Sequence, residues 1–209
     1  MSTLENLAAN LINGKAEEVK SSVNQAVEEG LTPREILNEG LLIGMSEVGR
    51  RFKNNEFYVP EVLIAARAMK AGMQILKPLL SETGVEPVGK VAIGTVKGDL
   101  HDIGKNLVSM MLEGGGFEIV DLGVDVSPEK YVEIVKNSGV NVIGMSALLT
   151  TTMLNMKTTI EALKTANVRD NVKIVIGGAP VTDSYAKEIG ADGYAADAAT
   201  AVDIVKSLI

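Results

Sequence analysis

The chain has 209 residues, of which 46% are hydrophobic, enough for one large domain or two small ones around a sizeable core. It has no cysteine, which excludes disulfides, thiolate metal sites and cysteine nucleophiles, and a formal net charge of −7 with few aromatic residues argues against a nucleic-acid partner. The N-terminus lacks the basic and apolar regions of a signal peptide, and no apolar run could span a bilayer, so we expect a cytoplasmic protein without membrane contact.

The first 80 residues have the apolar spacing of helices and contain no alternating, strand-like run. Thr32, Pro33 and Glu35 form a capping-box pattern that marks one helix start. Asn54-Asn55 and Pro60 predict a turn before the last helix. The helices are expected over residues 3–12, 15–29, 33–53 and 60–80.

The polar stretch SETGVEPVG, residues 81–89, reads as a linker, and the composition changes after it. Short runs rich in β-branched residues then alternate with helical segments, which predicts a parallel, doubly wound α/β sheet of five strands. The expected strands are KVAIGTV (90–96), FEIVDLG (117–123), NVIGMSA (141–147), KIVIGGA (173–179) and a weaker GYAA (193–196). Such sheets bind ligands outside the carboxyl ends of their strands, which here are followed by Asp99–Gly104, Ser146–Thr150 and Gly177–Pro180.

The only histidine of the chain, His101, lies in the sequence DLHDIG after the first predicted strand. A neutral imidazole can bind a metal through one nitrogen while its other N–H donates to a carboxylate, for which Asp99 is well placed. The alternative is an ordinary ion pair in a surface loop. Zinc or iron would need further histidine or cysteine ligands that the chain lacks, whereas a metal inside a macrocycle needs only one from the protein.

Three motifs resemble those of cobalamin-binding domains. DLHDIG matches their Asp-x-His-x-x-Gly motif, and SAL at Ser146 and GGA at Gly177 look like their second and third motifs. The segment GMSEVGRRFKNNEFYVPEVLIAARAMKAG is similar to the helical cap that precedes the corrinoid domain in methionine synthase and in corrinoid proteins of methyltransferase systems. The resemblance covers nearly the whole chain and implies a four-helix bundle cap (1–85) followed by a Rossmann-like, flavodoxin-like corrinoid-binding domain (86–209).

The resemblance also implies roles for residues. His101 would be the lower axial ligand of cobalt in a cobamide bound base-off/His-on, with Asp99 accepting its other N–H and Ser146 hydrogen-bonding Asp99 as a proton relay. Small residues, among them Gly94, would admit the nucleotide tail, and Phe52 and Val59 would cover the upper face of the corrin. The expected cofactor contacts are Gly98, Asp99, Leu100, His101, Asp102, Ile103, Gly104, Ser146, Leu148, Thr150, Gly177, Gly178, Ala179, Phe52 and Val59.

The function implied is a methyl carrier, rather than an enzyme by itself, that cycles between Co(I) and methyl–Co(III). Its implied partners are a substrate:corrinoid methyltransferase, a second methyltransferase with a thiol or tetrahydrofolate acceptor, and a reductive activase. Alternatives are the cobalamin subunit of an adenosylcobalamin mutase, a cobalamin-dependent sensor, and a receiver-like domain with Asp99 or Asp102 as phosphoacceptor. The sequence leaves the methyl donor, the final acceptor, the lower base of the cobamide and the oligomeric state open.

Overall fold

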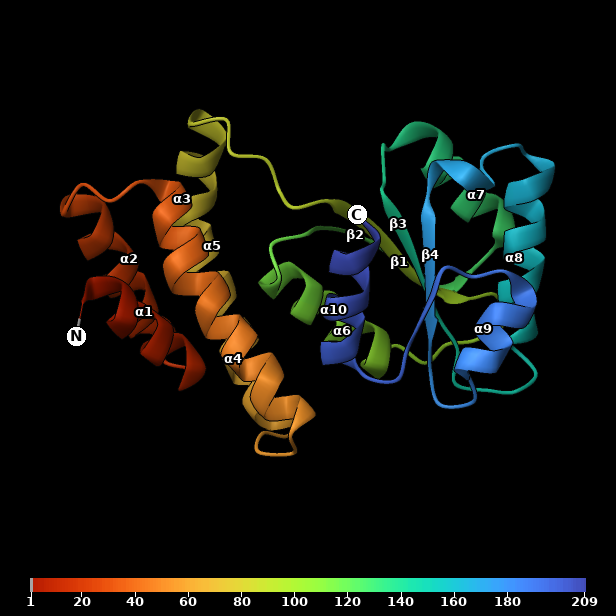
Figure 1. Ribbon diagram of the computed structural model, residues 1–209, viewed down its shortest axis with the longest axis horizontal. Coiled ribbons are helices and arrows are strands. Elements are labelled where there is room, and N and C mark those ends of the chain that lie inside the picture. The colour runs from red at the N-terminus through yellow and green to blue at the C-terminus, as the bar shows by residue number, and fades with distance from the viewer. Residues whose placement is uncertain (1) are drawn as a thin grey trace. The chain divides into compact units, whose positions relative to one another are not determined.

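The structure is a computed structural model that describes residues 2–209. It divides into two compact units: one extends to Pro87 and includes Gly114–Gly116, and the other comprises Val88–Glu113 and Phe117–Ile209 (Figure 1). Among these residues, no helix has both the length and the apolar character needed to cross a membrane.

The first unit is helical, as predicted. Residues 33–53 are helical without a break and form a single rod. The expected bundle of four helical rods is therefore present. The elements are α1 (Thr3–Ile12), α2 (Ala16–Glu28), α3 (Pro33–Glu35), the π-helix η1 (Ile36–Leu41), α4 (Leu42–Lys53) and α5 (Val59–Glu82).

The π-helical turn Ile36–Leu41 is the one departure from the predicted helix over 33–53. Apolar spacing reveals which face of a helix is buried but not whether its hydrogen bonds run to the fourth or the fifth residue. The turn contains Gly40, where an added Cβ would lie 2.6 Å from a methyl carbon of Leu7 on α1. Glycine therefore permits the close approach of α1 to this rod. Leu7 of α1 and Leu41 of the rod are both fully buried.

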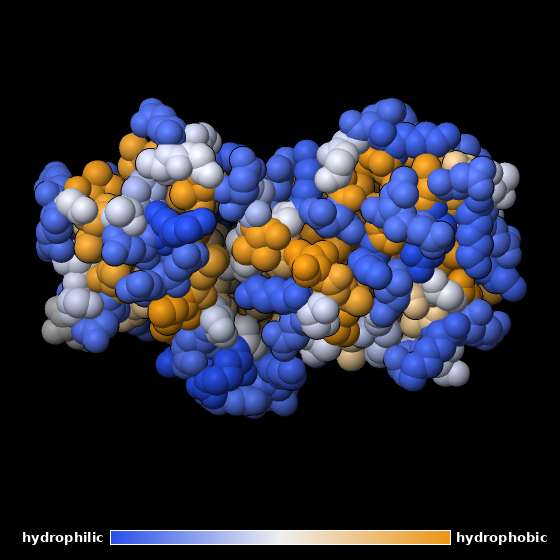
Figure 2. All heavy atoms as spheres, turned by 45° about the horizontal axis from the view of Figure 1, so that its top comes forward, coloured by the Kyte–Doolittle hydropathy of each residue, from blue (hydrophilic) through white to orange (hydrophobic). Residues whose placement is uncertain are grey.

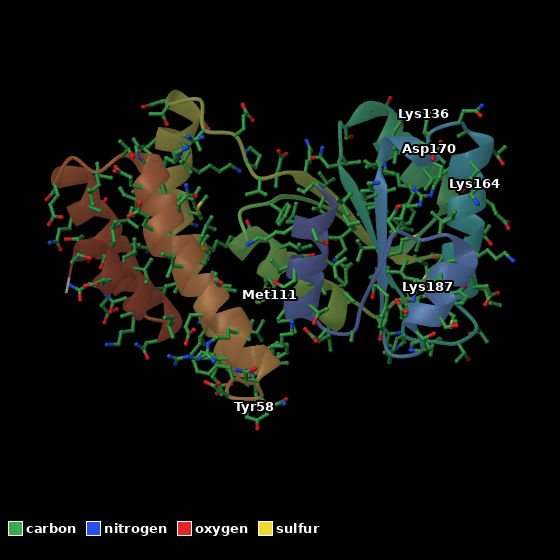
Figure 3. All side chains as sticks on the ribbon, in the orientation of Figure 1. Tyr58, Met111, Lys136, Lys164, Asp170 and Lys187 are labelled. Atoms are coloured by element: carbon green, nitrogen blue, oxygen red, sulfur yellow. The ribbon has the colours of Figure 1, made fainter. Side chains whose placement is uncertain are left out.

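Local signals in the sequence set the helix ends. The Thr32 hydroxyl accepts from the Glu35 N–H at 3.2 Å while the Glu35 carboxylate accepts from the Thr32 N–H at 2.8 Å, which is the predicted capping box. Asn55 has a positive φ of 58° in the predicted turn after α4. Tyr58 lies at the tip of this turn and points away from the helices (Figure 3), and the Glu61 carboxylate accepts from its N–H at 2.9 Å.

The second unit alternates strands and helices, so the predicted α/β class is confirmed. The first predicted strand matches β1 residue for residue, and β2 extends three residues beyond its expected end. The elements are β1 (Lys90–Val96), α6 (Ile103–Gly114), β2 (Glu118–Val126), α7 (Pro128–Asn137), β3 (Val142–Ser146), α8 (Leu154–Thr165), the 3-10 turn η2 (Arg169–Asn171), β4 (Lys173–Gly177), α9 (Asp183–Ile189), β5 (Gly193–Ala195) and α10 (Ala198–Leu208).

The five strands are parallel and lie in the order β2-β1-β3-β4-β5. This is the flavodoxin-like order, in which the chain leaves β1 toward one edge of the sheet and builds the other edge from β3. Figure 1 shows α6 and α10 on one face of the sheet and α7, α8 and α9 on the other. A hydrophobic core lies on the second face and includes Ile143, Ile174 and Tyr131, all buried.

Candidate functional site

The predicted site residues of the second unit follow three neighbouring strands. In the sheet, Thr95 of β1 pairs with Ser146 of β3, and Ser146 pairs with Gly177 of β4, so the loops after these strands begin at the same level. The β1 and β3 loops flank the point where the strand order reverses, which is the usual ligand position in a doubly wound sheet. The structure thus brings the DLHDIG, SAL and GGA motifs to one edge.

Asp99 is the buried centre of this edge. Its side chain is 0% exposed, and its two oxygens serve different loops. Oδ2 accepts from the Thr152 hydroxyl at 2.6 Å and from the N–H groups of Leu148 at 2.8 Å and Leu149 at 3.3 Å. Oδ1 faces His101. The carboxylate therefore connects the loop after β1 to the loop after β3.

These donors keep the Asp99 carboxylate charged. Burial would raise the pKa of the Asp99 carboxyl, but the hydrogen bonds from Thr152, the Leu148 N–H and His101 together outweigh burial and hold the pKa well below its ordinary value. An ionised carboxylate can only accept hydrogen bonds. Its neighbours must therefore supply the protons.

His101 is held with one ring nitrogen occupied and the other available. Its ring nitrogen Nδ1 lies 2.8 Å from Asp99 Oδ1, and its backbone N–H donates to the same oxygen at 3.1 Å. Its backbone carbonyl accepts from the buried Thr95 hydroxyl at 2.9 Å. Since Asp99 only accepts, a neutral imidazole has its proton on Nδ1 and its lone pair on Nε2. The side chain is 51% exposed, so a metal can reach this ring.

The two loops that meet at Asp99 expose large apolar side chains. Leu100 and Ile103 are 71% and 81% exposed, and Leu148 and Leu149 of the β3 loop are exposed as well. In Figure 2 apolar atoms reach the surface in patches between the polar ones. Exposed apolar groups beside a polar anchor indicate a binding surface for a bulky, largely apolar ligand.

The start of α6 leaves room beside His101. Gly104 is exposed, and a Cβ added there would meet nothing within 4 Å. Asp102 begins the helix, since its carbonyl accepts from the Asn106 N–H at 2.8 Å and its carboxylate from the Asn106 amide at 3.0 Å. Gly98, with a φ of +81°, turns the chain out of β1.

Among residues 2–209, the predicted hydrogen bond from Ser146 to Asp99 is not formed. The hydroxyl that reaches Asp99 is that of Thr152, six residues later, because the β3 loop turns back and places Leu148, Leu149 and Thr152 against the carboxylate. Ser146 ends β3 and is half-buried. Thr150 is exposed in the turn before α8.

The glycines of the predicted tail slot have different surroundings. A Cβ at Gly94 would lie 2.7 Å from the Tyr131 hydroxyl, so the small size of Gly94 serves the packing of α7. A Cβ at Gly178 would overlap the Ala147 carbonyl, and φ is +126° there, so this glycine permits the β3 and β4 loops to touch. Gly177 is half-buried, whereas Ala179 is exposed beside Gly178.

The two residues predicted to cover the corrin belong to the first unit. Phe52 is half-buried near the end of α4, and Val59 is 38% exposed as the first residue of α5. Both are apolar side chains near the turn between these helices. Their covering role stays a prediction.

Sequence reasoning missed four residues of this edge. Thr152 follows the predicted contact Thr150 by two residues, and only the path of the loop distinguishes the two. Thr95 had the signal of a polar residue inside an apolar strand. Lys105, buried on α6, and Asp125, at the end of β2, carried no local signal.

Known proteins are similar to this chain in sequence over both of its units. Two family models, each described as a B12 binding domain, match residues 3–77 and 89–203. Dimethylamine corrinoid protein 1 of Methanosarcina acetivorans is 44% identical over 207 residues, covering 99% of this chain and 97% of that protein.

Solved structures are also similar over the whole chain. A cobalamin-binding protein from Desulfitobacterium hafniense DCB-2 has a TM-score of 0.84 and 31% identity, with 100% of both chains covered. The methanol:cobalamin methyltransferase complex from Methanosarcina barkeri matches with a TM-score of 0.86 and 28% identity, covering 98% of this chain and 78% of that one.

Proposed function

Because this chain belongs to the family of corrinoid proteins with B12 binding domains, we propose that it carries a methyl group on a bound cobamide between two methyltransferases. The observation that carries the proposal is the arrangement of His101: one imidazole with Nδ1 fixed by a buried carboxylate, Nε2 available, and exposed apolar residues on the two loops that meet at Asp99. A corrin supplies four equatorial nitrogens, so one protein ligand suffices.

The residues of the second unit fit such a group. His101 Nε2 would be the lower ligand of a cobamide bound base-off/His-on, while Leu100, Ile103 and Leu148 would contact the corrin. The open space at Gly104 would allow the ligand to approach the start of α6. The bound cobamide would supply a cobalt that accepts a methyl group as Co(I) and releases it from methyl–Co(III).

The chain's own contribution is to set the strength of the ligand. Asp99 holds the Nδ1 proton and makes Nε2 a better donor, as a carboxylate does for a metal-bound histidine. Thr152, in place of the predicted Ser146, completes the relay by fixing the second carboxylate oxygen.

The partners follow from the same proposal. A substrate-specific methyltransferase would deliver the methyl group, a second would pass it to a thiol or tetrahydrofolate, and a reductive activase would restore oxidised cobalt. The relative named as a dimethylamine corrinoid protein and the solved methanol:cobalamin methyltransferase complex support a methyltransferase partner. Phe52 and Val59 would shield the methyl group.

The test is reconstitution of the purified chain with methylcobalamin and with reduced cobamide, followed by visible spectra. We expect a base-off, histidine-ligated spectrum in the parent and its loss in His101→Ala, with ligation restored by added imidazole. Ser184→Ala, at an exposed position of α9, is the control and should resemble the parent. A colourless parent protein, or an unchanged spectrum in His101→Ala, would overturn the proposal.

A further inference from the structure

We propose that Asp125, near the end of β2, is a positioning residue that holds the histidine loop so that the His101 imidazole stays on Asp99. None of the three sequence motifs includes Asp125. The inference rests on the proposed function only for its consequence at cobalt. Its structural part concerns the protein without ligand.

Asp125 is both a hydrogen-bond donor and a hydrogen-bond acceptor to the loop after β1. Its N–H donates to the Asp99 carbonyl at 3.0 Å, and its carboxylate oxygen Oδ1 accepts from the Gly98 N–H at 2.7 Å. These two bonds fix the backbone on either side of the Gly98–Asp99 peptide. The residue therefore acts on the main chain, whereas Leu148 and Thr152 act on the Asp99 carboxylate.

The backbone of β2 is distorted to make this contact. Asp125 has φ +53° and Gly123 has φ +81°, and the pairing of β1 with β2 shifts register between Ile93 and Gly94 and again between Gly94 and Val96. A left-handed residue other than glycine costs about 1 kcal/mol, although aspartate and asparagine tolerate it best. The strand accepts this cost where its N–H leaves the ladder to reach Asp99.

A second contact from β2 fixes the chain on the other side of His101. Lys105 in the first turns of α6 is 2% exposed, and its ammonium donates to Asp121 at 2.6 Å and to Asn106 at 2.7 Å. Asp121 and Asp125 thus hold the segments after and before His101. The loop itself has no other backbone hydrogen bond to β2 among residues 2–209.

The position of His101 depends on this bracing because its hydrogen bonds to Asp99 are short-range. The imidazole and the backbone N–H of His101 both bond the carboxylate two residues earlier, so rotation of the Asp99–Leu100 peptide, whose carbonyl accepts from the Asp125 N–H, moves donor and acceptor relative to each other. With the peptide fixed, Nδ1 keeps its proton on Asp99 and Nε2 stays the free nitrogen. When the peptide is not held in place, we expect both tautomers of the His101 ring.

Three substitutions separate the two properties of Asp125. Asp125→Asn keeps an oxygen acceptor and tolerates the left-handed backbone, Asp125→Gly keeps the backbone but removes the acceptor, and Asp125→Ala removes both. The readouts on ligand-free protein are the ¹⁵N shifts of the single histidine ring, which report the tautomer, and hydrogen exchange of the His101 amide. The readout on cobamide-loaded protein is the fraction with histidine ligation.

We expect Asp125→Asn to match the parent in all three measurements. Asp125→Gly and Asp125→Ala should show mixed tautomers, His101 amide exchange about tenfold faster, since a hydrogen bond to a charged group is lost, and a lower histidine-ligated fraction. If Asp125→Ala does not fold, the glycine variant carries the test, because it has no strained Cβ.

Two results would overturn the inference: Asp125→Gly behaving like the parent, or Asp125→Asn behaving like the alanine variant. The first would show that the carboxylate acceptor does not position the loop, and the second that hydrogen-bond acceptance is not its role. A parent protein that fails to bind cobamide would overturn the proposed function instead. The tautomer and exchange comparisons would still test Asp125.

Discussion

The hydroxyl of Thr152 can be removed with little change of shape by Thr152→Val. It donates to Asp99 Oδ2 at 2.6 Å in a place where both residues are buried. A hydrogen bond to a charged group contributes about 1.5–3 kcal/mol. Because the N–H groups of Leu148 and Leu149 stay on the same oxygen, we expect a loss near the lower end, about 1.5 kcal/mol of unfolding free energy at pH 7.

The loss should depend on pH with a defined sign. The pKa of Asp99 is lower in the folded chain than its ordinary value of 3.8, so its stabilisation is present above that pH and disappears as the pH falls below it. In Thr152→Val the folded-state pKa of Asp99 rises toward the ordinary value. Because the unfolded chains of parent and variant titrate alike, the difference should be full at pH values above 3.8 and shrink only as the pH falls below that value.

Urea unfolding of the ligand-free protein at several pH values measures this difference, with Thr152→Ser as the matched control. The serine variant keeps the hydroxyl and loses one methyl group, for which we expect about 0.8 kcal/mol at every pH. A valine variant as stable as the parent would refute the reasoning. So would a valine loss that stays constant with pH, since the hydroxyl would then act by packing alone.

Three further substitutions test a buried hydroxyl, a close contact between two loops and a helix cap. Tyr131→Phe should leave stability unchanged or raise it by about 1 kcal/mol in thermal unfolding, because the buried hydroxyl has no hydrogen-bond partner among residues 2–209; a clear loss would reveal one. Gly178→Ala should cost about 3 kcal/mol or more in urea unfolding, since its Cβ would overlap the Ala147 carbonyl, and an unchanged midpoint would contradict this contact. Thr32→Ala should cost about 1 kcal/mol by loss of its helix cap, and an equal loss in Thr32→Ser would argue against the hydroxyl as the cause.

Most of the fold could be predicted because its signals are local. The capping box at Thr32, the turn at Asn54-Asn55 and the β-branched run of β1 each lie within a few residues, and each element formed where its signal stood. The π-helical turn at Ile36–Leu41 could not be predicted, because it changes hydrogen-bond partners without changing which residues are apolar.

The site could be predicted only where a residue type is rare. His101 is the sole histidine, and Asp99 stands two residues before it, so their pairing was expected and is formed. The donor on the other carboxylate oxygen was not predicted correctly, because Ser146 and Thr152 both follow β3 and the folding of that loop decides between them. Asp125 depends on the strand pairing of β1 with β2, which no local pattern specifies.

The contacts of Asp99 also bear on how the protein folds. Its donors on the β3 loop lie 49, 50 and 53 residues further along the chain, so the carboxylate has no partner on that side until β1 and β3 have paired. Contacts of such sequence separation require long loops to close and form late. A nascent chain that has only reached β2 would therefore expose a charged aspartate with an unrestrained histidine. A ligand that binds only the assembled loop would stabilise the completed sheet through mass action.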